Sequence, residues 1–136
     1  MAIHATKDDV KFGVGDTVRV TQKITEGNKT RLQSFEGMVI GIKGRDINKT
    51  FTVRRIGVQQ VGIEKIFPLY SPLIEKIEVT RQGTKGIRRA KLYYTRKKPK
   101  REVDKIYSRV KKHVVIQQKP KSKKITKRKT RTAKKS

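Results

Sequence analysis

The sequence contains no cysteine among its 136 residues. It therefore has no disulfide framework, no zinc knuckle and no thiol chemistry. No apolar run approaches the roughly 20 residues of a membrane-spanning helix, and the first residues lack the apolar segment of a signal peptide. These absences predict a soluble, intracellular protein with no membrane partner.

Acidic residues are scarce, and their scarcity is uneven along the chain. There are 37 Lys and Arg against 11 Asp and Glu, which gives a formal net charge of +26. Residues 1–80 hold 13 basic and 9 acidic groups, whereas residues 81–136 hold 24 basic and 2 acidic groups. A free protein with this charge would repel itself, so we expect a polyanionic partner that binds the second part.

Residue types that carry catalysis or bind metals are few and isolated. His4 and His113 have no partner that would suggest a metal site or a triad, and the pair Asp8 and Asp9 is more typical of a helix start. The glycine pairs lack the Gly-Lys-Ser/Thr ending of a P-loop. We therefore predict no enzymatic activity, no cofactor, no metal site and no small-molecule substrate.

Short segments of alternating polarity, separated by turn residues, predict an all-β fold. The six expected strands are residues 17–24, 30–43, 50–56, 61–69, 73–80 and 88–95. Gly37 interrupts the alternation of the second segment and indicates a bulge or bend, which lets one long strand serve two sides of a small barrel. We expect residues 1–11 to form an N-terminal arm, with Thr6 at the start of a short helix, and residues 12–98 to form a partly open SH3-like β-barrel.

Residues 81–101 contain ten Lys or Arg and no Asp or Glu. Gly83 and Gly86 are expected to turn the chain through positive φ, so that strands 73–80 and 88–95 form a protruding basic β-hairpin. A solvated charged face would contain interspersed acids, so the hairpin is predicted to bind phosphates. The candidate RNA-binding residues are Arg54, Arg55, Arg81, Lys85, Arg88, Arg89, Lys91, Tyr93, Arg96, Lys97, Lys98, Lys100 and Arg101.

Two pairs of adjacent residues in these strands are expected to point to opposite faces. Of Arg54 and Arg55, the outward guanidinium would extend the basic patch. Of Tyr93 and Tyr94, one is expected in the core, and the other would stack on a base or lie beneath arginine side chains. Core packing of both tyrosines also remains open.

After residue 98 the pattern changes to a helical period. Val103, Ile106, Tyr107, Val110 and Val114 form an apolar stripe that predicts a helix within residues 99–118. Three uses of the stripe remain open, namely docking on the barrel, lying along RNA, or meeting another protein. Residues 119–136 hold ten basic groups and no acid, so we expect a disordered Lys/Arg-rich tail.

Several phrases in this order carry a family resemblance. They are GDTVRV at 15–20, TRLQSFEGMVI at 30–40, FTVRRI at 51–56, VGIEKIFPLYSPLIEKIEV at 61–79 and GIRRAKLYYTR at 86–96. Over residues 12–98 the chain resembles bacterial-type large-subunit ribosomal protein nineteen.

The resemblance implies an SH3-like barrel with a basic extension, located on the ribosome in the cytoplasm. It further implies contacts with large-subunit rRNA, with small-subunit rRNA across an intersubunit bridge, and with large-subunit proteins three and fourteen. The RNA contacts of the family fall here on Arg81, Lys85, Arg88, Arg89, Lys91, Arg96, Lys97 and Lys98. The alternative from another class is a free, nucleoid-like DNA-packaging protein.

The chain departs from the family pattern in three places. Tyr70 stands where the family usually has histidine, the N-terminal helix is shortened to the first dozen residues, and the part beyond about residue 100 is much longer. The resemblance therefore implies no contacts for residues 99–136.

Overall fold

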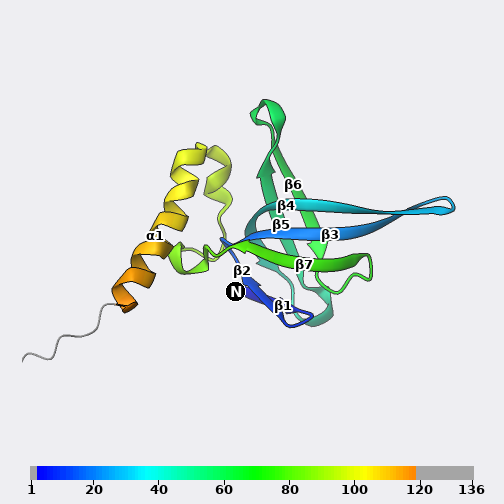
Figure 1. Ribbon diagram of the computed structural model, residues 1–136, viewed down its shortest axis with the longest axis horizontal. Coiled ribbons are helices and arrows are strands. Elements are labelled where there is room, and N and C mark those ends of the chain that lie inside the picture. The colour runs from blue at the N-terminus through cyan, green and yellow to red at the C-terminus, as the bar shows by residue number, and fades with distance from the viewer. Residues whose placement is uncertain (1–2, 119–136) are drawn as a thin grey trace, which may run out of the picture.

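The computed structural model describes residues 3–118, with side chains as far as residue 111, and consists of two antiparallel sheets followed by one α-helix (Figure 1). The small sheet pairs β1 (His4–Lys7) with β2 (Val10–Gly13). The large sheet has the strand order β6-β5-β4-β3-β7. Its strands are β3 (Thr17–Glu26), β4 (Lys29–Lys43), β5 (Thr50–Ile56), β6 (Gly62–Pro68) and β7 (Ile74–Arg81).

The long strand β4 holds the large sheet together, as its sequence predicts. Residues 29–38 pair with β3, and residues 38–43 pair with β5. The register shifts between Val39 and Gly41 rather than at Gly37, where the bulge was expected. Gly37 has a different function, because a Cβ there would lie 2.5 Å from the carbonyl oxygen of Arg54. Its missing side chain lets two strands approach closely.

The predicted all-β architecture is confirmed, and five of the predicted strands match β3, β4, β5, β6 and β7 to within two residues. Within residues 3–118 the pairing leaves β6 and β7 as the two edges of the large sheet, so the strands do not close a barrel. The narrower assignment to the SH3-like barrels therefore stays a prediction.

The N-terminal arm is a β-hairpin, so the helix start expected at Thr6 is wrong. Asp8 and Asp9 have φ values of 46° and 64° and turn the chain between β1 and β2. Asp tolerates this left-handed conformation better than most residues, which explains a tight turn at this position. Ala5 and Phe12 are opposite each other in the ladder and are both buried against the large sheet.

A cluster of aromatic rings fills the space enclosed by the curved sheet. The Phe51 ring meets Phe12 edge-on at 5.0 Å between centroids and stacks on Phe67 at 5.4 Å. Both geometries are favoured by the ring quadrupoles. Small β-branched residues such as Val18 and Val53 are fully buried around the rings. The core therefore lies within residues 5–77, with a few later side chains packed onto it.

The predicted second strand of the basic hairpin is wrong. After β7 the chain forms the 3-10 helix η3 (Thr84–Gly86), an irregular stretch, and the 3-10 helix η4 (Tyr93–Lys97). Leu92 and Thr95 are both buried and three residues apart, which matches the period of a 3-10 turn and not that of a strand. The period-two pattern of residues 88–95 was therefore misleading.

The predicted C-terminal helix is confirmed as α1 (Lys100–Gln118). Ile106 and Tyr107 of its apolar stripe are buried against the rest of the fold, and the carbonyl of Ile106 packs closely on Gly86. Of the three open uses of the stripe, docking on the domain is the one that the structure shows. Residues 119–136, where a disordered tail was predicted, lie outside the described residues.

Candidate nucleic-acid interface

The buried carboxylate of Asp16 connects the start of β3 to the segment after β7. One oxygen accepts hydrogen bonds from the backbone N–H of Gly83 at 2.7 Å and from the Thr84 N–H and hydroxyl at 2.9 and 2.7 Å. Its other oxygen accepts the N–H of Gly13 at 2.8 Å. Charge-assisted bonds of this kind are the strong ones. Asp16 therefore fixes the first turn of the basic segment, and the sequence analysis missed this residue.

Gly15 and Gly83 let two backbones pass each other beside this carboxylate. A Cβ on Gly83 would collide with the carbonyl of Gly15, which itself has a φ of 90°. The predicted reason for Gly83 and Gly86 was positive φ, but Gly83 has a φ of −125° and Gly86 has no positive φ. That prediction is wrong, because close backbone approach is what these glycines provide.

Further along, the basic segment is fastened to β4. The Leu92 N–H donates to the carbonyl of Ile40 at 2.8 Å, and the Thr95 hydroxyl donates to the carbonyl of Leu92 at 2.6 Å. Leu92 is fully buried, and Tyr93 packs beside Gly41. Residues 82–99 are therefore held to the domain at two points and carry their cations on a fixed backbone.

Glu64 on β6 brings two of the predicted residues together. Its carboxylate accepts hydrogen bonds from Arg96 at 2.7 and 2.8 Å and from Arg54 at 2.8 Å. The hydrogen bond from Arg96 is the main cause that holds the pKa of Glu64 below its ordinary value of 4.5, and Arg54 adds to it against the opposing effect of burial. The Arg96 guanidinium also lies 4.7 Å from the Tyr93 ring centroid. Arg54 and Arg96 thus take part in attachment of the segment.

Arg81 has a similar role at the end of β7. Its guanidinium lies 3.9 Å from the ring centroid of Tyr107, and the Tyr107 hydroxyl lies 2.6 Å from the Thr17 hydroxyl. Burial raises the pKa of Tyr107 above its ordinary value. Because this stack is a cation–π contact between β7 and α1, Arg81 helps to hold the helix in place.

The remaining predicted cations have a different environment. Lys98 pairs with Glu102 at 2.9 Å. Within the part of the chain whose side chains are described, no ion pair is seen for Arg55, Lys85, Arg88, Arg89, Lys91, Lys97, Lys100 and Arg101. Seven of these eight lie within residues 85–101, so the fixed segment presents a set of positive charges without acidic partners.

The two adjacent tyrosines lie in different environments, as their adjacency suggests. Tyr93 is half-buried against the core, with Lys91 and Arg96 near its ring, whereas Tyr94 is 40% exposed and lies beneath Arg89. Tyr93 was the residue predicted to bind RNA, but Tyr94 is the more exposed ring. Stacking of either ring on a base stays a prediction.

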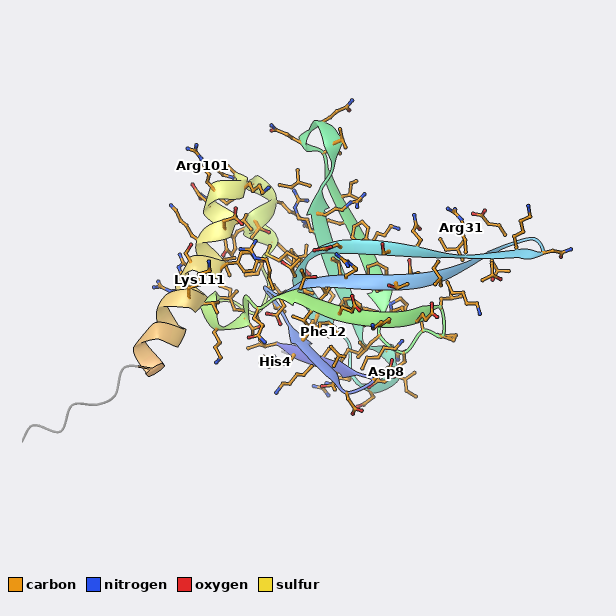
Figure 2. The ribbon with its side chains drawn as sticks, viewed as in Figure 1. His4, Asp8, Phe12, Arg31, Arg101 and Lys111 are labelled. Carbon is orange, nitrogen blue, oxygen red and sulfur yellow. The ribbon has the colours of Figure 1, made fainter. Side chains whose placement is uncertain are left out.

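Three further basic residues join this surface that the sequence analysis did not select. His4 and Lys11 come from the N-terminal hairpin and share a hollow with Lys85, Arg88 and Arg89. Arg109 of α1 lies beside Arg88, Arg89 and Tyr94. Figure 2 shows His4 and Phe12 close together on the β1–β2 ribbon. The two sides of the hollow are more than 60 residues apart in the sequence, so no local pattern could have indicated it.

Two other kinds of site are absent from the part of the chain that the structure describes, residues 3–118. No helix there is long and apolar enough to cross a membrane. Among the side chains that the structure describes, which end at residue 111, no three from His, Asp or Glu are grouped so that they could hold a metal ion.

The fold and the charge distribution define a strongly basic protein that is built mainly from β-strands. Residues 2–113 match the model of the ribosomal protein L19 family. The chain is 61% identical to the large ribosomal subunit protein bL19 of Thermosipho melanesiensis over 94 residues, which cover 66% of this chain and 80% of the relative. It is 54% identical to bL19 of Borreliella afzelii over 99 residues, which cover 73% of this chain and 81% of the relative. The chain belongs to the ribosomal protein L19 family, whose members are structural and non-enzymatic.

Proposed function

We propose that the protein is a structural constituent of the large ribosomal subunit and binds rRNA through the fixed basic segment, residues 81–101. The observation that carries the proposal is the set of cations without acidic partners between Lys85 and Arg101, on a backbone held at Asp16 and Leu92. Pre-positioned Lys and Arg side chains bind phosphates without losing much conformational freedom. The relatives named as large-subunit proteins support the assignment to that subunit.

Within that assignment we propose a finer location. The protein lies on the interface side of the large subunit, binds large-subunit rRNA and reaches small-subunit rRNA as part of an intersubunit bridge. Large-subunit proteins three and fourteen are its neighbours there, and the ribosome places it in the cytoplasm. Shape recognition by phosphate contacts suits this location, because Lys and Arg read the fold of RNA and not its base sequence.

We also propose that the large sheet is an open member of the SH3-like barrels. Five antiparallel strands curve around one aromatic core, and β4 pairs on both sides after a register shift. In a small barrel the interior is filled by side chains, as Phe12, Phe51 and Phe67 fill this one. The barrel would then be a rigid scaffold that holds the basic segment in a fixed position.

The proposal is tested by replacing Arg88, Arg89 and Lys91 together with glutamine. Glutamine removes the charges and keeps most of the side-chain length, and none of the three side chains is fully buried. We expect the variant to melt at the wild-type temperature and to enter large subunits poorly, or to enter them and join small subunits poorly. A sucrose gradient separates the two failures.

A matched control changes three exposed lysines of the sheet, Lys23, Lys29 and Lys43, to glutamine. This control should incorporate and support subunit joining like the wild type. Wild-type behaviour of the Arg88, Arg89 and Lys91 variant would contradict the proposal. Sedimentation of the protein with DNA, and its loss from large subunits after DNase treatment, would favour the DNA-packaging alternative.

A further inference from the structure

A hollow of about 670 Å³ lies between the N-terminal hairpin and the start of the basic segment. Its walls come from three stretches of the chain, namely β1 and β2, the end of β7, and residues 82–90. A volume of this size is within the range of small-ligand sites. Its two kinds of lining residue indicate what it is suited to bind.

Part of the lining is apolar. Phe12, which is almost fully buried, and the half-buried Val79, Ile87 and Ala90 all contribute to the wall. Apolar surface that faces water in a hollow is unfavourable in free energy, and an apolar ligand that covers this surface removes the cost. A flat, weakly polar ring of the size of a nucleobase would cover it well, because every base has an apolar face.

The other part of the lining is cationic. Lys11, Lys85, Arg88 and Arg89 contribute to the same hollow, and His4 lies at its wall. The one acid in the lining is Asp16, whose two oxygens already accept four hydrogen bonds from Gly13, Gly83 and Thr84. The lysines and arginines are therefore the groups of the lining that are available to an anion.

The hollow is also preformed. The hydrogen bonds from Gly83 and Thr84 to Asp16 hold its far wall, and the pairing of Ala5 with Phe12 holds its near wall. A site that needs no ordering on binding loses less affinity to conformational entropy. An apolar recess beside fixed cations is therefore built into the fold.

We propose that this hollow receives one unstacked nucleotide of rRNA, with its base against Val79, Ile87 and Ala90 and its phosphates on Lys85, Arg88 and Arg89. The inference rests on the proposed function and names the element of RNA that the basic segment recognises. A regular duplex presents its phosphates outward and keeps its bases stacked, so it would contact only the cations. An acidic peptide would likewise leave the apolar lining uncovered.

The test compares two probes, a single-stranded oligoadenylate and a blunt RNA duplex, for the wild type and for Ala90→Leu. Leucine preserves the charge and occupies part of the recess. We expect Ala90→Leu to bind the oligoadenylate roughly tenfold more weakly, as the loss of the apolar contact of one base implies, and to bind the duplex as the wild type does. Thr25→Leu, which places leucine at an exposed position of the β3–β4 arm, is the matched control and should change neither affinity.

A second measurement needs no variant and covers the case in which Ala90→Leu lowers the melting temperature. Adenine bound in the recess should shift the methyl NMR signals of Val79, Ile87 and Ala90 by ring currents, with no shift at the exposed Leu32 of the β3–β4 arm. Unshifted signals at these three residues, or an unchanged oligoadenylate affinity in a folded Ala90→Leu protein, would overturn the inference. If the wild type binds neither probe, the proposed function fails. If the wild type binds both probes but neither the methyl signals nor the Ala90→Leu affinity changes, only the inference about the hollow fails.

Discussion

Residues 3–80 and residues 81–111 use their charged side chains in different ways. On the sheet, cations and acids are paired, either across neighbouring strands, as in Arg19 with Glu36 at 2.8 Å, or along one strand, as in Lys76 with Glu78 at 2.7 Å. In the second region most cations of residues 85–101 have no such partner among the described side chains. Exposed pairs contribute little to stability, so the difference concerns binding. Paired charges leave the sheet surface nearly neutral, and unpaired charges attract a polyanion.

The two regions also differ in how they are held. The sheet is stabilised by its own aromatic core, whereas residues 81–111 bury only a few side chains, such as Leu92 and Ile106, in the core of the other region. The segment needs polar connections to compensate, and Asp16 and Glu64 supply them. In this molecule the few acids that contact the segment therefore hold it in place, and its cations remain available.

The largest effect that separates the regions is expected in the salt dependence of RNA binding. If the segment neutralises roughly 6–10 phosphates, affinity should fall about 10³–10⁵-fold between 50 and 200 mM salt, by analogy with duplex DNA. Replacing Arg88, Arg89 and Lys91 with glutamine should lower the slope of log affinity against log salt by about 3. The variant of Lys23, Lys29 and Lys43 should keep the wild-type slope. Equal slope changes in both variants would show that the sheet binds RNA as well.

The next largest effect concerns stability and falls on the sheet. Phe51→Ala removes the ring that lies between Phe12 and Phe67, and should lower the free energy of unfolding by about 3–5 kcal/mol. Denaturant unfolding measures this loss. Tyr94→Ala, at an exposed ring of the basic region, is the control and should cost far less. Similar losses in the two variants would mean that the second region has a core of its own.

The fold was predictable from sequence wherever the side chains alternate against one core. Val18 and Val20 on β3, and Phe51 and Val53 on β5, are buried two residues apart as the pattern requires. The strand predicted after β7 was wrong. The spacing of Leu92, Tyr94 and Thr95 fits both a strand and a 3-10 turn, and only the residues that they contact in the fold decide between the two. The carbonyl of Ile40, which Leu92 contacts, is more than 50 residues away.

The candidate site was predictable in its charge and not in its shape. A run of ten cations without an acid identifies the segment that carries the unpaired charges. The roles of Arg81 and Arg96 could not be read from that run, because they depend on Tyr107 and Glu64, which lie in other elements. Asp16 was overlooked for the same reason, since its hydrogen bonds to Gly83 and Thr84 connect positions far apart in the sequence.

A smaller effect is expected where Asp16 joins the two regions. Asp16→Asn keeps one carbonyl oxygen but turns an N–H₂ group toward the N–H of Gly13 or of Gly83. Leaving a buried donor unsatisfied should cost about 1–3 kcal/mol in the free energy of unfolding. Asp46→Asn, in an exposed turn, is the control. If thermal unfolding shows no difference between the two variants, the carboxylate does not hold the basic segment.

The smallest effect should appear at Glu64, and it should depend on pH. Arg96 and then Arg54 lower the pKa of this carboxyl in the folded protein, so its contribution to stability is present above its ordinary pKa of 4.5 and is lost as the pH falls through the folded value. Glu64→Gln should therefore be slightly less stable than the wild type at neutral pH, and the two should converge in acid. The effect is small because Arg96 is half-exposed and solvent screens the pair.

The Glu64 experiment measures melting temperature against pH for the wild type, Glu64→Gln and Glu75→Gln. Glu75 is exposed on β7, and no ion pair is seen for it among the described side chains, so its variant should follow the wild-type curve. Raising the salt concentration should reduce the difference between Glu64→Gln and the wild type at neutral pH. A difference that is independent of pH would mean that Glu64 acts by packing and not by its charge. The attachment of residues 92–97 to the domain would then rest on the burial of Leu92 and Thr95 and on the hydrogen bond from Leu92 to Ile40.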